Sequence, residues 1–189
     1  MDATVLTISD NYFKGWGCGY RTLQTICSWI IGNNNLDKQV PSIRAIQETL
    51  FTLEDKEKSF IGSRQWIGSF EVCLVLDYHY DVLSKIVHIP NGKDLSQHVD
   101  VVKKHFLELG SPIMMGGDKD CSSKGVVGIH EGSENTYFLI VDPHLVGEAK
   151  DNKQLENNHW VKWQNLNEFL DSSFYNLCMP QLQCKLLNK

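Results

Sequence analysis

A cysteine stands between two glycines near the start of the chain, in the segment GWGCGYRTLQTICSWI of residues 15–30. A thiol is a nucleophile only as its thiolate, and an ordinary cysteine has a pKa of about 8.5. The apolar residues after Cys18 recur at helical spacing, which predicts that a helix starts at this residue. A helix start lowers the thiol pKa through its dipole and offers free backbone N–H groups to an oxyanion.

The two flanking glycines support the same interpretation. Gly17 and Gly19 permit backbone torsions that are forbidden to other residues, and they clear space for a substrate carbonyl. The segment therefore predicts an activated nucleophile. From these residues alone, a structural cysteine is an equally weighted alternative.

A cysteine nucleophile also needs a base and a third group that orients the base. Among the seven histidines of the chain, His144 is favoured because it follows the β-branched run TYFLIVD and stands two residues after Asp142. In extended backbone, residues two apart point to the same side, so both side chains can share a face. Pro143 between them stiffens the backbone. A turn is an equal alternative, because Asp-Pro is a common turn dipeptide.

The remaining histidines are expected to have no catalytic role. His98 and His105 are expected at the surface or boundary of an amphipathic helix, and His159 in an edge strand. The others occupy ordinary helix and strand contexts: His79, His88 and His130.

Composition bounds the class of protein. A length of 189 residues without repeats or linkers favours one domain spanning 1–189. A net charge of -5 argues against binding to nucleic acid or an anionic membrane. We expect no membrane insertion and no signal peptide, and hence a cytoplasmic protein. The six cysteines lack metal-site spacing, so they are predicted to be free thiols, mostly in the core.

Apolar periodicity predicts helices in the first half and strands in the second half of the chain. Helices are expected over 18–31, from 41 to 50, from 66 to 80 and from 94 to 109, with a loop at 51–63 and a strand at 82–89. Short β-branched or apolar runs follow: PIMM, VVGIH, TYFLIVD, WVKW and SFYNLCM. The predicted fold class is α+β, with helices packed on a mainly antiparallel sheet. Trp160 and Trp163 are expected in the sheet core.

Together these segments resemble the ubiquitin-fold-modifier-specific cysteine proteases, most closely their short, single-domain type. The resemblance rests on GWGCGYRTLQTICSWI and the downstream DPH. It continues through GSRQWIG (62–68), PIMMGGD (112–118), FLIVDPH and SFYNLC (173–178), and so covers nearly the whole chain from Gly15.

The resemblance implies a papain-like fold with Cys18 as nucleophile, His144 as general base and Asp142 as its orienter. It implies cleavage after the C-terminal glycine of a ubiquitin-like modifier, which matures the precursor and can release the modifier from lysines. No metal or organic cofactor is implied. The modifier is the expected partner, and the protein is expected to be a monomer.

Residues 1–14 depart from the family pattern. Family members carry an upstream tyrosine that donates to the oxyanion, whereas Tyr12 stands too close to Cys18 to match it. Losing one oxyanion donor costs about 10²–10³ in turnover. A weak enzyme, or a modifier-binding adaptor, is therefore one alternative. A related deubiquitinase or autophagy-type protease is another, since those families share parts of the WGC segment and the DPH.

Two further features are interpreted partly through the resemblance. The segment MMGGDKDCSSKG of residues 114–125 is predicted to be a mobile loop beside the active site, with a hairpin connection as the alternative. Trp16 and Trp66 are candidates for the walls of a narrow channel that admits a glycine-terminated tail. Core packing is at least as good an interpretation for both.

Overall fold

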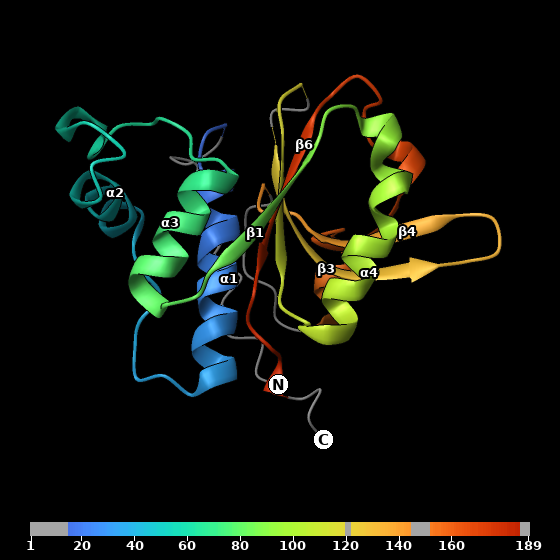
Figure 1. Ribbon diagram of the computed structural model, residues 1–189, viewed down its shortest axis with the longest axis horizontal. Helices are drawn as coiled ribbons and strands as arrows, with labels where there is room; N and C mark the ends of the chain where they lie inside the picture. Colours follow the sequence, from blue (N-terminus) through green and yellow to red (C-terminus); the bar gives the residue numbers. More distant parts are fainter. Residues whose placement is uncertain (1–14, 120–121, 145–151, 186–189) are drawn as a thin grey trace.

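The computed structural model describes residues 15–119, 122–144 and 152–185. Within them, six strands form one antiparallel sheet through the middle of the molecule (Figure 1). The strands are β1 (Ser84–Ile89), β2 (Ile113–Gly117), β3 (Ser123–Glu131), β4 (Thr136–Val141), β5 (Val161–Asn165) and β6 (Tyr175–Pro180). Their order across the sheet is β1-β6-β2-β3-β4-β5.

Helices cover both faces of this sheet (Figure 1). On one face lie α1 (Cys18–Asn34), α2 (Ile43–Thr52) and α3 (Ser69–Tyr80), and on the other lies α4 (Val99–Glu108). The short helix α5 (Asn152–Asn157) precedes β5. Among the described residues, no helix is long and apolar enough to cross a membrane. The predicted α+β class is confirmed.

Alternation along the strands divides the interior into two cores. Met114 packs with the α1–α3 layer, whereas its neighbours Ile113 and Met115 pack on the α4 side. In the same way Cys178 faces the first core, and Leu177 faces the second. Successive side chains of a strand point to opposite faces, so a sheet covered on both sides reads as a continuous apolar run.

The first helix starts at Cys18 as predicted. It passes through Gly32 and ends at Asn34, where Asn35 takes the left-handed conformation with φ of 50°. The second helix starts after Ser42, whose Oγ accepts a hydrogen bond from the Ala45 N–H, so Pro41 precedes the helix rather than lying in its first turn.

Two other helices start later than predicted. The helix α3 starts at Ser69 rather than Trp66, because the Glu71 carboxylate accepts a hydrogen bond from the Gly68 N–H and caps it there. Residues 92–98 form a 3₁₀ helix, and α4 starts only at Val99. Asp94 accepts hydrogen bonds from the side chains of Asn91 and Gln97, and it caps no helix.

Several predictions about single residues are wrong. Trp160 is buried, but Trp163 is 52% exposed, because Gln164 takes the inward-facing position of the edge strand β5. His105 is buried, and its Nε2 lies 2.9 Å from the Ser111 carbonyl oxygen. His159 lies in the turn before β5 with φ of 58° rather than in a strand.

Candidate active site

Cys18 is the first residue of α1, and only 7% of it is exposed. Gly17 caps the helix without a side chain, so the first N–H groups of α1 receive no side-chain cap. The face of α1 that carries Cys18 lies against β3, where the Thr22 Oγ1 is 3.4 Å from the Ser123 carbonyl oxygen. Strand β3 therefore forms the opposite wall beside the thiol.

The glycines around Cys18 do not act as the sequence suggested. Gly17 has ordinary torsions, with φ of -83° and ψ of -2°, and Gly19 has no positive φ. A Cβ added to Gly19 would lie 2.5 Å from the carbonyl oxygen of Ile67. The prediction of unusual torsions is wrong. Residue 19 is glycine for a different reason: a side chain there would collide with the backbone of Ile67.

Asp142 and His144 come together in a turn rather than along a strand. Strand β4 ends at Val141, and Asp142 Oδ1 accepts hydrogen bonds from the His144 backbone N–H at 2.9 Å and from Nδ1 at 2.8 Å. The Asp142 N–H donates to the Trp160 carbonyl oxygen at 2.9 Å, which ties the turn to the start of β5. The extended geometry was wrong, but the predicted meeting of the two side chains is found.

The His144 ring also forms a hydrogen bond with the Cys18 side chain. Hydrogen bonds with Asp142 and with Cys18 raise the pKa of His144 to about 10, against the opposing effect of burial. Burial raises the pKa of Cys18, but hydrogen bonds from His144 and Ser123 outweigh it and hold that pKa below its usual value. Both shifts favour the charged forms, a thiolate on Cys18 and an imidazolium on His144.

The pKa of Asp142 is shifted in the direction that this pair requires. Burial raises the pKa of Asp142, but the two hydrogen bonds from His144 outweigh it and keep the carboxylate ionised. Nδ1 contacts Asp142, so Nε2 remains for the thiol. A carboxylate that fixes one ring nitrogen turns the other toward the nucleophile.

Ser123 is a neighbour of Cys18 that the sequence did not indicate. Its backbone and its side chain both form hydrogen bonds with Cys18, and each lowers the thiol pKa. The sequence CSSKG around it has no catalytic signature, and only the pairing of β2 with β3 brings it to the start of α1. The predicted loop at 114–125 is thus the β2–β3 hairpin, and its β3 side lies beside Cys18.

A buried glutamine, Gln47, forms hydrogen bonds with the loop at 62–68, which contacts Gly19 through Ile67. Gln47 donates to the Ser63 carbonyl oxygen at 3.0 Å and to the Tyr20 hydroxyl at 3.3 Å, and it accepts from the Gly62 N–H at 2.8 Å. The Tyr20 hydroxyl in turn donates to the Gln65 carbonyl oxygen at 2.8 Å. This network fixes the loop against α1 and α2.

The two tryptophans near the site differ in exposure. Trp16 is buried and meets Tyr20 edge-on, with ring centroids 5.6 Å apart, whereas Trp66 is 47% exposed on the loop before α3.

Tyr12, the doubtful oxyanion donor, lies outside the described residues. Among the residues that the structure describes, no three His, Cys, Asp or Glu side chains gather as a metal site.

Comparison with known proteins places this chain in a peptidase family. The family model for peptidase family C78 matches residues 5–178. Ufm1-specific protease 1 of Mus musculus is 43% identical over 170 residues, which cover 89% of this chain and 77% of that protein. Ufm1-specific protease 2 of Homo sapiens is 38% identical over 174 residues, which cover 92% of this chain and 36% of that protein.

A solved structure is similar in fold as well as in sequence. The crystal structure of UfSP from C. elegans superposes with a TM-score of 0.77 at 33% identity, over 91% of this chain and 31% of that chain. This chain therefore spans about a third of the length of these two longer relatives.

A cysteine at a helix start, facing a histidine just after a strand of an antiparallel sheet, is the architecture of a papain-like cysteine peptidase. The matches to residues 5–178 and to a relative at 43% identity identify the family. This chain belongs to peptidase family C78.

Proposed function

We propose that Cys18 is the nucleophile, His144 the acid and base, and Asp142 the orienting residue of a protease that cleaves a ubiquitin-like modifier after its C-terminal glycine. The modifier is Ufm1, because the similar proteins are Ufm1-specific proteases. The reaction matures the precursor and also releases the modifier from lysine side chains. We further propose a monomer of one domain, which sedimentation and limited proteolysis will test.

In the first step the Cys18 sulfur attacks the carbonyl carbon of the terminal glycine of the modifier. A C–S bond forms, and the negative charge moves to the carbonyl oxygen, which faces the N–H groups at the start of α1. The C–N bond then breaks as the His144 imidazolium donates its proton to the leaving amine. The products are a thioester on Cys18 and a free amine.

In the second step water hydrolyses the thioester. Neutral His144 takes a proton from the attacking water, a C–O bond forms, and the C–S bond breaks to release the glycine carboxylic acid, which then loses its proton to solvent. His144 is again an imidazolium beside the Cys18 thiolate. Asp142 keeps its contact with Nδ1 through both steps, so the ring does not rotate away from the reacting atoms.

The observation that carries the proposal is the geometry of one imidazole ring. Its Nδ1 lies 2.8 Å from Asp142 Oδ1, and the same ring forms a hydrogen bond with Cys18. A surface histidine in a turn has no need for both contacts. The lowered pKa of Cys18 and the raised pKa of His144 have the directions that a thiolate–imidazolium pair requires.

The experiment is a cleavage panel. The protein and its Cys18→Ser variant are incubated with precursors of Ufm1, ubiquitin and an autophagy modifier, and with a Ufm1–lysine conjugate. Release of the extension from Ufm1 alone, lost in Cys18→Ser, supports the proposal. Cleavage of ubiquitin or of the autophagy modifier overturns the substrate assignment, and binding without cleavage overturns the catalytic one.

A further inference from the structure

A groove of about 380 Å³ opens beside the start of α1, on the side where α2 packs. Its lining comes from three segments: the first turns of α1, the start of α2 and the loop at 62–63. Trp16, two residues before Cys18, is part of the lining. A peptide in extended conformation rises about 3.3 Å per residue, so a chain bound over Cys18 can reach this groove within a few residues.

Two arginines line the groove, one from each helix: Arg21 of α1 and Arg44 of α2. Among the described lining residues none is acidic, although the whole chain carries a net charge of -5. Arg21 Nη1 donates a hydrogen bond to the neutral Gln24 Oε1 at 2.9 Å. The groove of this acidic protein is therefore lined by two guanidinium groups.

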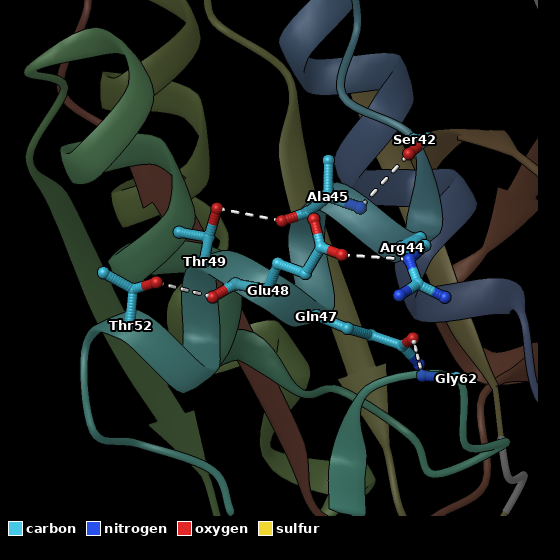
Figure 2. Close-up of polar contacts among 8 residues, drawn as sticks. All are labelled: Ser42, Arg44, Ala45, Gln47, Glu48, Thr49, Thr52 and Gly62. Carbon is cyan, nitrogen blue, oxygen red and sulfur yellow. Dashed lines mark hydrogen bonds and ion pairs between the residues drawn. The ribbon is translucent and has the colours of Figure 1, made fainter. Parts of the chain in front are cut away.

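Arg44 is paired with Glu48 through only part of its guanidinium. Its Nε donates to Glu48 Oε1 at 2.9 Å, and this contact uses one edge of the guanidinium. Figure 2 shows the two Nη nitrogens directed away from Glu48, toward the side of α2 where Gln47 contacts Gly62. An arginine whose Nη groups remain available matches the planar, two-oxygen geometry of a carboxylate.

The base of the groove is preorganised. Gln47 is 2% exposed, and its contacts with Gly62, Ser63 and Tyr20 hold the lining in place. A rigid lining reduces the entropy lost when a peptide side chain enters.

We propose that this arginine groove, defined by Trp16, Arg21, Gln24, Arg44, Gln47 and Gly62, binds an acidic side chain of the substrate polypeptide and sets a sequence preference beside the scissile bond. The inference rests on the proposed protease function. The carboxylate comes either from the modifier, before its terminal glycine, or from the residues that follow that glycine.

The test measures binding first, with cleavage as a separate readout. Fusions of Ufm1 to a short peptide carry Asp or Asn at each of four positions before or after the terminal glycine, and their Kd for Cys18→Ala is measured by fluorescence anisotropy. At one position Asp is expected to bind about three- to tenfold more tightly than Asn, with a preference that weakens at high salt. If the preference appears at a position before the terminal glycine, the carboxylate comes from the modifier. If it appears at a position after that glycine, the carboxylate comes from the residues that follow.

Variants of Arg44, built on Cys18→Ala, locate the preference. Arg44→Glu is expected to abolish or invert it, and Arg44→Lys to retain part of it. The matched control is Lys104→Glu on α4, across the sheet. Lys104 forms the same i,i+4 pair with a glutamate, and its side chain is 72% exposed, as is that of Arg44. The control is expected to keep the full preference.

The outcomes separate this inference from the proposed function. Equal binding of Asp and Asn at every position, or a preference that survives Arg44→Glu, overturns the groove assignment even where Ufm1 is cleaved. An Asp preference lost in Arg44→Glu supports the groove even if the protein with Cys18 intact cleaves none of the fusions, a result that overturns the protease proposal alone.

Discussion

The carbonyl oxygen of Ile67 lies 2.5 Å from the point at which a side chain on Gly19 would begin. Heavy atoms never approach a Cβ so closely, so residue 19 has to be glycine while the loop before α3 keeps its position. Gly19 thus allows close contact between two segments 48 residues apart in sequence, the start of α1 and the loop before α3.

Gly19→Ala is therefore expected to destabilise the protein by about 1–3 kcal/mol, because backbone atoms of Ile67 must move. Activity should fall as well, since the shift occurs beside Cys18. Urea unfolding and initial rates measure both effects. The control is Gly32→Ala on the same helix, where nothing lies within 4 Å of an added Cβ. It should be neutral or stabilising, by up to about 1 kcal/mol. Equal losses in both variants would contradict the steric account.

The pH dependence follows from the opposite pKa shifts of Cys18 and His144, the proposed catalytic pair. The pKa of Cys18 is lowered, so the thiolate persists to lower pH than in an ordinary cysteine and is lost as the pH falls through that lowered pKa. The pKa of His144 is raised to about 10, so the imidazolium persists until the pH rises to that value. We expect a bell-shaped profile of kcat/KM, with an acid limb from Cys18 below the pH of an ordinary thiol and an alkaline limb from His144 near pH 10. Its two limbs report apparent values of the coupled pair.

Alkylation by iodoacetamide separates the thiolate from the rest of catalysis. Cys18 should react at pH 7 at least about tenfold faster than in His144→Asn, because an unassisted thiol is mostly protonated there. Cys73 complicates the measurement, since its hydrogen bond with Cys178, at 3.3 Å between the sulfurs, lowers the pKa of Cys73 as well. The comparison should use Cys73→Ser as background. An alkylation rate of Cys18 that is the same in wild type and in His144→Asn would contradict the proposed pairing of Cys18 with His144.

Asp142→Asn tests the orienting role. Asp142 Oδ1 holds both the ring and the backbone of His144, and its loss should reduce kcat/KM by about 10²–10⁴. The pKa of His144 should fall, which moves the alkaline limb to lower pH. Glu131→Gln, in a surface ion pair with Lys103, is the control and should retain activity. An unshifted alkaline limb in Asp142→Asn would argue against the role.

His105 predicts a pH dependence of stability that is independent of catalysis. Burial lowers the pKa of His105 below its usual 6.5, so the unfolded chain takes up a proton before the folded one does. Stability is then lost as the pH falls from about 6.5 through the lower, folded pKa. Urea unfolding of wild type and His105→Gln at pH 7.5 and pH 5 should show a smaller pH effect in the variant. His98→Gln is the control at the other end of this helical segment.

The sequence determined the elements and the identities of the proposed catalytic residues. Helical spacing after Cys18 predicted the start of α1, and the β-branched runs predicted the later strands, because both depend on local patterns of burial. The pair Asp142 and His144 stood out because the two residues are close in sequence. The catalytic roles of these residues were then predicted from the resemblance to known motifs, because periodicity alone indicates only secondary structure.

Tertiary structure decided which neighbours those residues have. Ser123 meets Cys18 only because β3 packs against α1, and Gly19 is required only because Ile67 arrives from another segment. His105 is buried because other segments pack over it, whereas the side chain of Trp163 lies on the outer face of an edge strand and stays exposed. Contacts between segments distant in sequence leave no local pattern, since either partner alone is compatible with many surroundings.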